Sequence, residues 1–214
     1  MPVQPTNNSP LQAPNPKRNR AKEYKILKQY RKITEHAGLD GATRPDILFN
    51  YRDSDYVAAY GQFKGNIQVG MSSKPLFSTT KNTLRHELKH AEQEIFILRY
   101  LGFEKFKAFC AKQMGISKKD LIDYPGILNK DEFNEAYYTK AHKKFGQLHS
   151  KEEIERARKL IKATVNYPSL SKAAFETFSV GDSTIEKLGI GVKFLYTYYT
   201  NLLEREARKA ARGF

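Results

Sequence analysis

Cysteine is nearly absent from this sequence. Cys110 is the single cysteine among 214 residues, so no intrachain disulfide can form, and we expect the protein to occupy a reducing compartment. Cys110 lies in a stretch where apolar residues recur with helical spacing. We therefore expect its thiol to be buried and inert rather than to act as a nucleophile.

Two kinds of hydrophobic segment are also missing. No run of about eighteen apolar residues occurs, which argues against a membrane-spanning helix. The first residues lack the apolar centre of a secretory signal peptide. We therefore expect a cytoplasmic protein, or a virion component packaged from a cytoplasm, with no membrane as partner.

Acidic residues are scarce relative to basic ones. The chain has 23 Asp and Glu against 37 Lys and Arg, for a formal net charge of +14. Such an excess attracts polyanions, and we expect nucleic acid or another polyanion to bind the basic N-terminal region. The alternative is that the cations are solvated helix faces. They cluster at Lys17, Arg18, Arg20, Lys22, Lys25, Lys28, Arg31 and Lys32, and again at Arg205, Arg208, Lys209 and Arg212.

The length of the chain fits one domain with an appendage. Residues 1–18 are rich in proline and asparagine and poor in large apolar residues, so we predict a disordered arm there. Residues 19–214 are predicted to form a single domain with an inserted helical region at about 102–190. The oligomeric state stays open.

The spacing of apolar residues predicts an α+β fold that is mostly helical. Three short β-rich runs, at 46–51, 57–63 and 66–70, predict a small antiparallel sheet. The last of them precedes the long helix predicted at 82–100, and we expect its exposed edge to be able to bind an extended peptide. Further helices are predicted at 20–36, 103–114, 117–122, 130–145, 151–165 and 192–211, with shorter pieces at 169–178 and 185–188.

The helix predicted at 82–100 carries the pattern H-E-x-x-H, at His86, Glu87 and His90. Two histidines four residues apart lie on one helix face and can bind one tetrahedral metal ion. Glu87 is rotated by about 100° from His86, so it can reach a water beside the metal and act as general base. The alternative is an exposed helix with two incidental histidines. An apolar stripe for packing this helix is formed by Leu84, Leu88, Ala91, Ile95 and Leu98.

A catalytic zinc site needs a third protein ligand. The strongest candidate lies in the last predicted helix, where Glu204 shares a face with the small residues Ala207 and Ala211. Glu206 lies about 200° around the same helix, so only one of these two glutamates can face the metal. The remaining alternatives are Glu94, one turn beyond His90, and a three-histidine site with His142 and His149.

The H-E-x-x-H pattern followed by the late E-R-E-A of residues 204–207 resembles the zincin superfamily of metallopeptidases, in its glutamate-ligand form. The resemblance covers about 47–100 and 196–211. The sequence is similar in these parts to small zincins of bacteriophages and mobile elements. It implies a zinc-dependent hydrolase acting on peptide bonds, with Glu87 as general base. The third ligand that it implies is Glu204, because the family glutamate is followed three residues later by alanine, here Ala207.

Two features depart from the family pattern. More than a hundred residues separate His90 from Glu204, and Arg208 stands where many such families have Asp or Asn. A second function therefore stays open beside the metallopeptidase: a basic nucleic-acid-associated or virion structural protein that retains a zincin-like scaffold.

Overall fold

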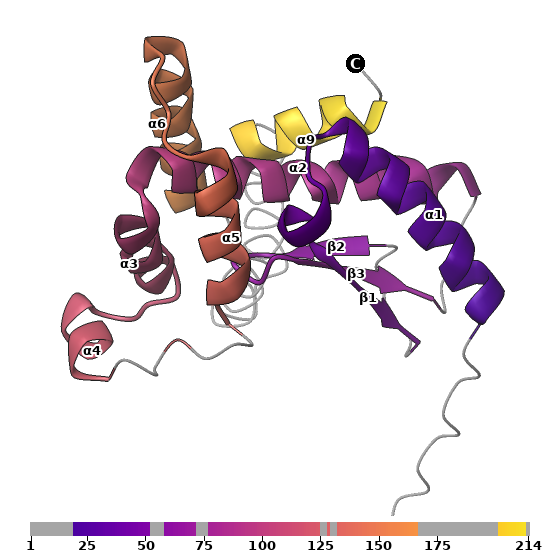
Figure 1. Cartoon of the computed structure of the whole chain (residues 1–214), viewed down its shortest axis with the longest axis horizontal. Helices are drawn as coiled ribbons and strands as arrows, with labels where there is room; N and C mark the ends of the chain where they lie inside the picture. Colours follow the sequence, from indigo (N-terminus) through magenta and orange to yellow (C-terminus); the bar gives the residue numbers. More distant parts are fainter. Residues whose placement is uncertain are drawn as a thin grey trace, which may run out of the picture.

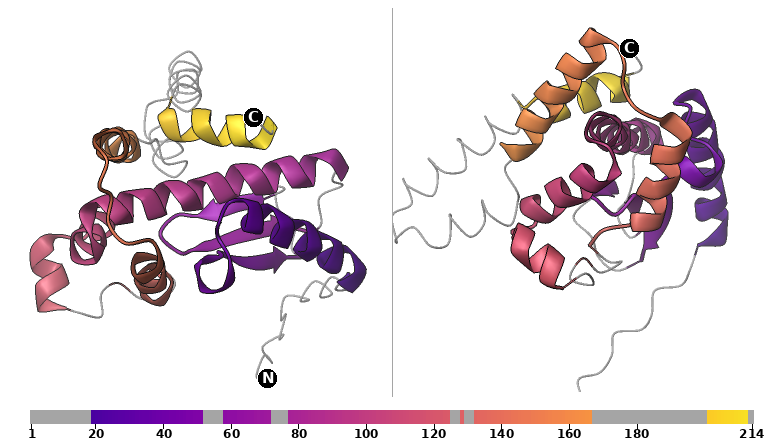
Figure 2. Two further views of the ribbon diagram at one scale, coloured as in Figure 1. Left: turned by 45° about the horizontal axis from the view of Figure 1, so that its top comes forward. Right: turned by 60° about the vertical axis from the view of Figure 1, so that its left-hand side comes forward.

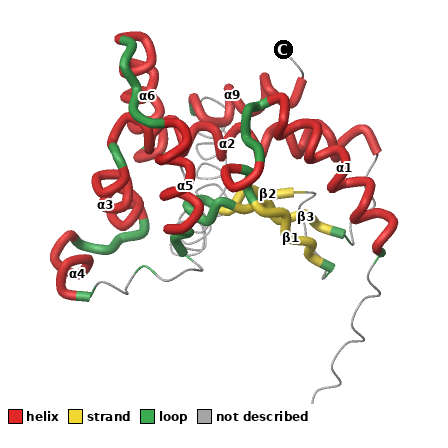
Figure 3. Tube along the Cα trace, viewed as in Figure 1, coloured by secondary structure: helices red, strands yellow, loops and turns green. Residues whose placement is uncertain are grey.

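The computed structural model describes residues 19–51, 58–71, 77–124, 128, 132–166 and 201–212. The predicted arm at 1–18 and the predicted helical pieces at 169–178 and 185–188 lie outside these residues. Helices lie over and beside one short sheet (Figures 1 and 3), which confirms the α+β, mostly helical class. The helices are α1 Arg20–His36, η1 Gly41–Thr43, α2 Phe77–Leu101, α3 Phe103–Gln113, α4 Lys118–Asp123, α5 Glu135–Phe145, α6 Lys151–Val165 and α9 Leu202–Arg212.

The sheet has three strands, β1 Asp46–Asn50, β2 Ala58–Gly61 and β3 Asn66–Gly70, in the order β1-β3-β2. Strand β2 pairs with β3 antiparallel, whereas β1 pairs with β3 parallel. The sheet is therefore mixed, and the prediction of an antiparallel sheet was wrong for the β1 pairing. The physical reason is that the strand with the most buried side chains, β3, with Ile67 at 0% and Val69 at 2% exposure, takes the centre. The strand beside α2 at the sheet edge is consequently β2, not β3 as predicted.

Local sequence signals fix where most helices begin and end. The side chain of Asn19 accepts from Lys22 N and caps α1, and Ser150 with Glu153 forms a capping box at α6. Asn134 caps α5 in the same way, so this helix begins at Glu135 rather than at the predicted residue 130. Between α2 and α3 the chain turns at Gly102, which has φ +75°.

Helix α2 lies at the centre of the fold and contacts most of the other described elements. It runs between α9 on one side and the sheet with α1 on the other, as both views of Figure 2 show. The predicted stripe of Leu84, Leu88, Ala91, Ile95 and Leu98 is buried throughout, with at most 4% exposure. Because the helix is enclosed on both sides, residues on its two flanks can form different contacts, one set with α9 and one set with β2.

The predicted burial of Cys110 is confirmed, since its side chain has 0% exposure. Burial also raises the pKa of this thiol far above its usual value, so the thiolate is suppressed. None of the helices in the described residues combines the length and the apolar character needed to cross a bilayer.

Candidate metal centre

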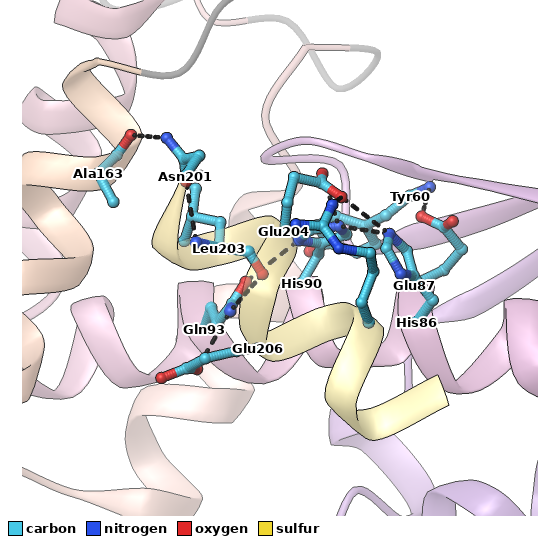
Figure 4. Close-up of polar contacts among 11 residues, drawn as sticks. Tyr60, His86, Glu87, His90, Gln93, Ala163, Asn201, Leu203, Glu204 and Glu206 are labelled. Carbon is cyan, nitrogen blue, oxygen red and sulfur yellow. Dashed lines mark hydrogen bonds and ion pairs between the residues drawn. The ribbon is translucent and has the colours of Figure 1, made fainter. Parts of the chain in front are cut away.

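Helices α2 and α9 bring together three side chains that are far apart in sequence. His86 and His90 project from consecutive turns of α2, and Glu204 projects from the first turn of α9 toward them (Figure 4). Ala207, one turn further along α9, is fully buried. A methyl group at this position allows a helix to approach its neighbour closely, as the sequence led us to expect for α9 and α2.

The donor atoms of these residues are spaced as ligands of one ion would be. His86 Nε2 lies 3.2 Å from Glu204 Oε2, His90 Nε2 lies 3.4 Å from Glu204 Oε1, and the two histidine Nε2 atoms are 3.3 Å apart. Ligands of a tetrahedral ion with bonds of about 2.1 Å are separated by about 3.4 Å. The group His86, His90 and Glu204 therefore fits a metal ion, and imidazole with carboxylate suits zinc and other first-row divalent ions.

Glu204 is the most deeply buried member of this group, with 1% exposure. A buried carboxylate needs positive charge or hydrogen-bond donors nearby. Both histidines are close, and Arg208 Nη1, one turn along α9, is 3.8 Å from Glu204 Oε2. Arg208 thus places a cation beside the carboxylate at the position where the resemblance led us to look for Asp or Asn.

Glu87 lies beside the three donors without joining them. Its Oε2 accepts a hydrogen bond of 2.8 Å from Tyr60 N on β2, so the carboxylate is held on the flank of α2 that faces the sheet. Burial raises the pKa of Glu87 above its usual value, although the fields of His90 and His86 oppose this rise. Glu87 therefore lies outside the donor group, and its role as general base stays a prediction.

The ring of His90 contacts Tyr60 of the sheet and Gln93 of α2 itself. The ring of Tyr60 stacks against its ring with centroids 6.5 Å apart, and its Nδ1 lies 3.1 Å from Gln93 Oε1. Burial by itself would lower the pKa of His90, but the hydrogen bond to Glu204 and the fields of Glu87 and Glu204 raise it above its usual value. The ring therefore lies in a strongly negative environment, which also favours a bound cation.

The other sequence candidates for the third ligand lie elsewhere. Glu206 accepts hydrogen bonds from Gln93 and from Arg156 on α6. Glu94 faces the sheet side of α2, and His142 and His149 lie on α5 and after it, so none of these belongs to the donor group. Of the alternatives left open by the sequence, Glu204 is the one that the fold brings to the histidines.

Glu94 forms a second buried contact between α2 and the sheet. Its carboxylate accepts from the hydroxyls of Tyr60 and Tyr138 and from Phe63 N at 3.1 Å. Sequence reasoning considered Glu94 only as a metal ligand. The spacing of Glu94 could have indicated this contact with the sheet, because a residue seven positions after Glu87 lies on the same helix face. Glu87 and Glu94, two turns apart on α2, thus each accept a hydrogen bond from a backbone N–H of the same β-hairpin.

Comparison of the chain with protein-family models, with curated proteins and with solved structures finds no match.

Proposed function

We propose that this protein is a zinc-dependent metallopeptidase in which His86, His90 and Glu204 hold the ion and Glu87 is the general base. The observation that carries the proposal is the tetrahedral spacing of the three donor atoms, with a carboxylate outside the donor group held beside them. The metal when bound would polarise a peptide carbonyl and lower the pKa of a water.

The residues around the ion support this chemistry. Glu87 can take a proton from a water and pass it to the leaving amine, and burial brings its pKa closer to the neutral range in which a general base works best. The hydrogen bond from Tyr60 N fixes its carboxylate in place. Among the described strands, β2 is at the edge of the sheet and lies beside α2, so a peptide in extended form could pair with it next to the site.

The test begins with metal content. Wild type and the variants His86→Ala, His90→Ala and Glu204→Ala, each dialysed against zinc, are analysed by mass spectrometry, and we expect about one zinc per chain in the wild type alone. Zinc-loaded wild type and Glu87→Gln are then incubated with a proteome-derived peptide library. We expect Glu87→Gln to retain zinc and lose cleavage, whereas the matched change Glu92→Gln, on the Lys89 side of α2, retains both. Undiminished cleavage by Glu87→Gln would disprove the assigned mechanism.

A second function is favoured by the outer face of α1. Arg20, Lys25, Lys28, Arg31 and Lys32 are all exposed, and together with Tyr24 they fall within an arc of about 140° around the helix. Tyr24 is 67% exposed. An exposed aromatic ring among cations can stack on a base while the cations contact phosphates. Glu35, in the last turn, is the one carboxylate of α1 on this arc, so we also propose that this face binds nucleic acid.

Salt dependence distinguishes this binding surface from a merely solvated helix. We expect affinity for a labelled single-stranded oligonucleotide to fall steeply with salt, and changing Lys25, Lys28, Arg31 and Lys32 to Gln should reduce the slope of log K against log salt by up to about 3. The control changes four exposed cations of α6 to Gln, namely Lys151, Arg158, Lys159 and Lys162. Equal losses in both variants would show that net charge alone is responsible.

A further inference from the structure

Gln93 occupies a buried position between the two helices that carry the metal donors. It lies on α2 three residues after His90 and has 3% exposure. Its Oε1 is 3.1 Å from His90 Nδ1, while its Nε2 donates to Leu203 O at 3.1 Å and to Glu206 Oε2 at 3.2 Å. One amide group therefore contacts a donor histidine on α2 and the residue that precedes Glu204 on α9 (Figure 4).

We propose that Gln93 is a positioning residue that selects the tautomer of His90 and locks α9, and with it Glu204, onto α2. The proposal rests on the metal site of the proposed function. The resemblance to zincins assigns no role to Gln93, and neither does the spacing of the H-E-x-x-H pattern.

The orientation of the amide follows from its surroundings. Both groups facing Nε2, the Leu203 carbonyl and the Glu206 carboxylate, are hydrogen-bond acceptors, so the amide nitrogen must point toward them and its oxygen toward His90. An amide oxygen only accepts, so its hydrogen bond with neutral His90 requires the proton to lie on Nδ1 rather than on Nε2, which faces Glu204 Oε1 at 3.4 Å. This leaves the Nε2 lone pair directed at His86 and Glu204, where a metal ion would bind.

The outer side of this arrangement is anchored on a third helix. Glu206 Oε2 accepts from Arg156 NH2 at 2.9 Å, and the guanidinium of Arg156 lies 4.9 Å from the centroid of the Phe96 ring. Glu206 is thus held between α6 and Gln93. This explains how two glutamates 200° apart on α9 can both serve one site, because Glu204 meets the histidines while Glu206 holds the residue that orients one of them.

Three variants separate the two roles of Gln93. Gln93→Met keeps the side-chain length and removes every hydrogen bond. Gln93→Glu keeps an acceptor for His90 Nδ1, loses the donor to Leu203 O and places a second carboxylate against Glu206. Adding Glu206→Gln relieves the repulsion between the two carboxylates but does not restore the hydrogen bond to Leu203 O. The matched control is Gln113→Met, the same change at the end of α3. Circular dichroism and thermal unfolding establish that each variant is folded.

The first readout is the tautomer of His90 in metal-free protein, from nitrogen-15 NMR of labelled histidine side chains in alkaline buffer. We expect wild type, Gln93→Glu and Gln113→Met to carry the proton on Nδ1, and Gln93→Met to lose this preference. The second readout is zinc affinity by competition with a chelator. We expect a loss of about 10- to 100-fold in Gln93→Met, a loss in Gln93→Glu, and partial recovery when Glu206→Gln is added.

The possible outcomes are distinct. An unchanged His90 tautomer in Gln93→Met overturns the first role, whatever happens to affinity. Zinc binding that Glu206→Gln fails to recover in the Gln93→Glu background overturns the second. A wild type that binds neither zinc nor cobalt refutes the proposed function instead, and the tautomer measurement still decides whether Gln93 orients His90.

Discussion

Glu94 gives a sharp prediction about stability because it is an ionisable group almost fully enclosed by protein. Its side chain has 7% exposure, and its carboxylate accepts from Tyr60, Tyr138 and Phe63 N. Burial raises the pKa of Glu94 from 4.5 to about 7, against the opposing effect of these hydrogen bonds. Both tyrosines remain donors at neutral pH, since burial raises the pKa of each hydroxyl well above its usual value.

The raised pKa sets the sign of the effect on folding. The folded protein holds the Glu94 proton more tightly than the unfolded chain, so the contribution to stability is complete below pH 4.5 and is lost as pH rises through about 7. The shift from 4.5 to about 7 corresponds to about 3 kcal/mol of free energy of unfolding. Gln has no charge to bury at any pH. Between pH 4 and pH 8, the stability of Glu94→Gln should therefore rise by about 3 kcal/mol relative to wild type.

Urea unfolding of metal-free protein measures this difference. The chain contains no tryptophan, so far-ultraviolet circular dichroism is the suitable probe. The titration of His90 also changes stability with pH in the same direction. Comparing the two proteins at each pH removes this contribution apart from the field of His90 on Glu94. Glu104→Gln, at an exposed site on α3, is the matched control and should give a curve parallel to that of wild type. A Glu94→Gln curve that is also parallel would refute the buried-acid reasoning.

Three further predictions concern the metal, the hairpin and the N-terminal cap of α6. Zinc at a hundred times its dissociation constant should raise the free energy of unfolding by about 3 kcal/mol, and calorimetry should show that Glu204→Ala abolishes this rise. Gly65→Ala should destabilise the protein by more than about 1 kcal/mol, because Gly65 has φ +58° and a Cβ there would lie 2.5 Å from the Tyr137 ring; a urea midpoint equal to that of wild type would contradict this. Ser150→Ala should cost about 1 kcal/mol through loss of the capping box of α6, and a loss below a few tenths would show that the helix end is held by other contacts.

The sequence was most informative where the relevant contacts are local. Helix α1 begins and ends at the predicted residues, and the apolar stripe of α2 is buried as predicted, because caps and 3.6-residue periodicity act within a few turns. For the same reason, the sequence could predict that one helix carries a candidate metal site at His86, Glu87 and His90. The start of α5 was misplaced because the capping role of Asn134 was not recognised. Helix α9 begins at Leu202, after a bend at Asn201, whereas the predicted helix ran from 192; residues 192–200 lie outside the described part.

Long-range pairings could not be predicted in this way. The parallel pairing of β1 with β3 depends on which strand the hairpin places at the centre, and a pattern of alternating residues is the same for both strand directions. The preference for Glu204 over Glu206 rested on resemblance to zincins. In the structure, the choice depends on α9 lying against both α2 and α6, so that the two glutamates meet different partners.

Assembly of the metal site depends on the docking of a distant segment. Gln93 and Leu203, which are hydrogen-bonded across α2 and α9, are 110 positions apart in the chain. Closing so long a loop costs entropy. Contacts between the two histidines cannot offset this cost, because both residues belong to α2 and neither attaches α9. Packing at Ala207, the bonds of Gln93 and a metal ion shared by the two helices would each favour the docked state. Metal binding and docking of α9 would therefore be thermodynamically linked, so that whatever loosens α9 would weaken metal binding, and a bound ion would hold α9 in place.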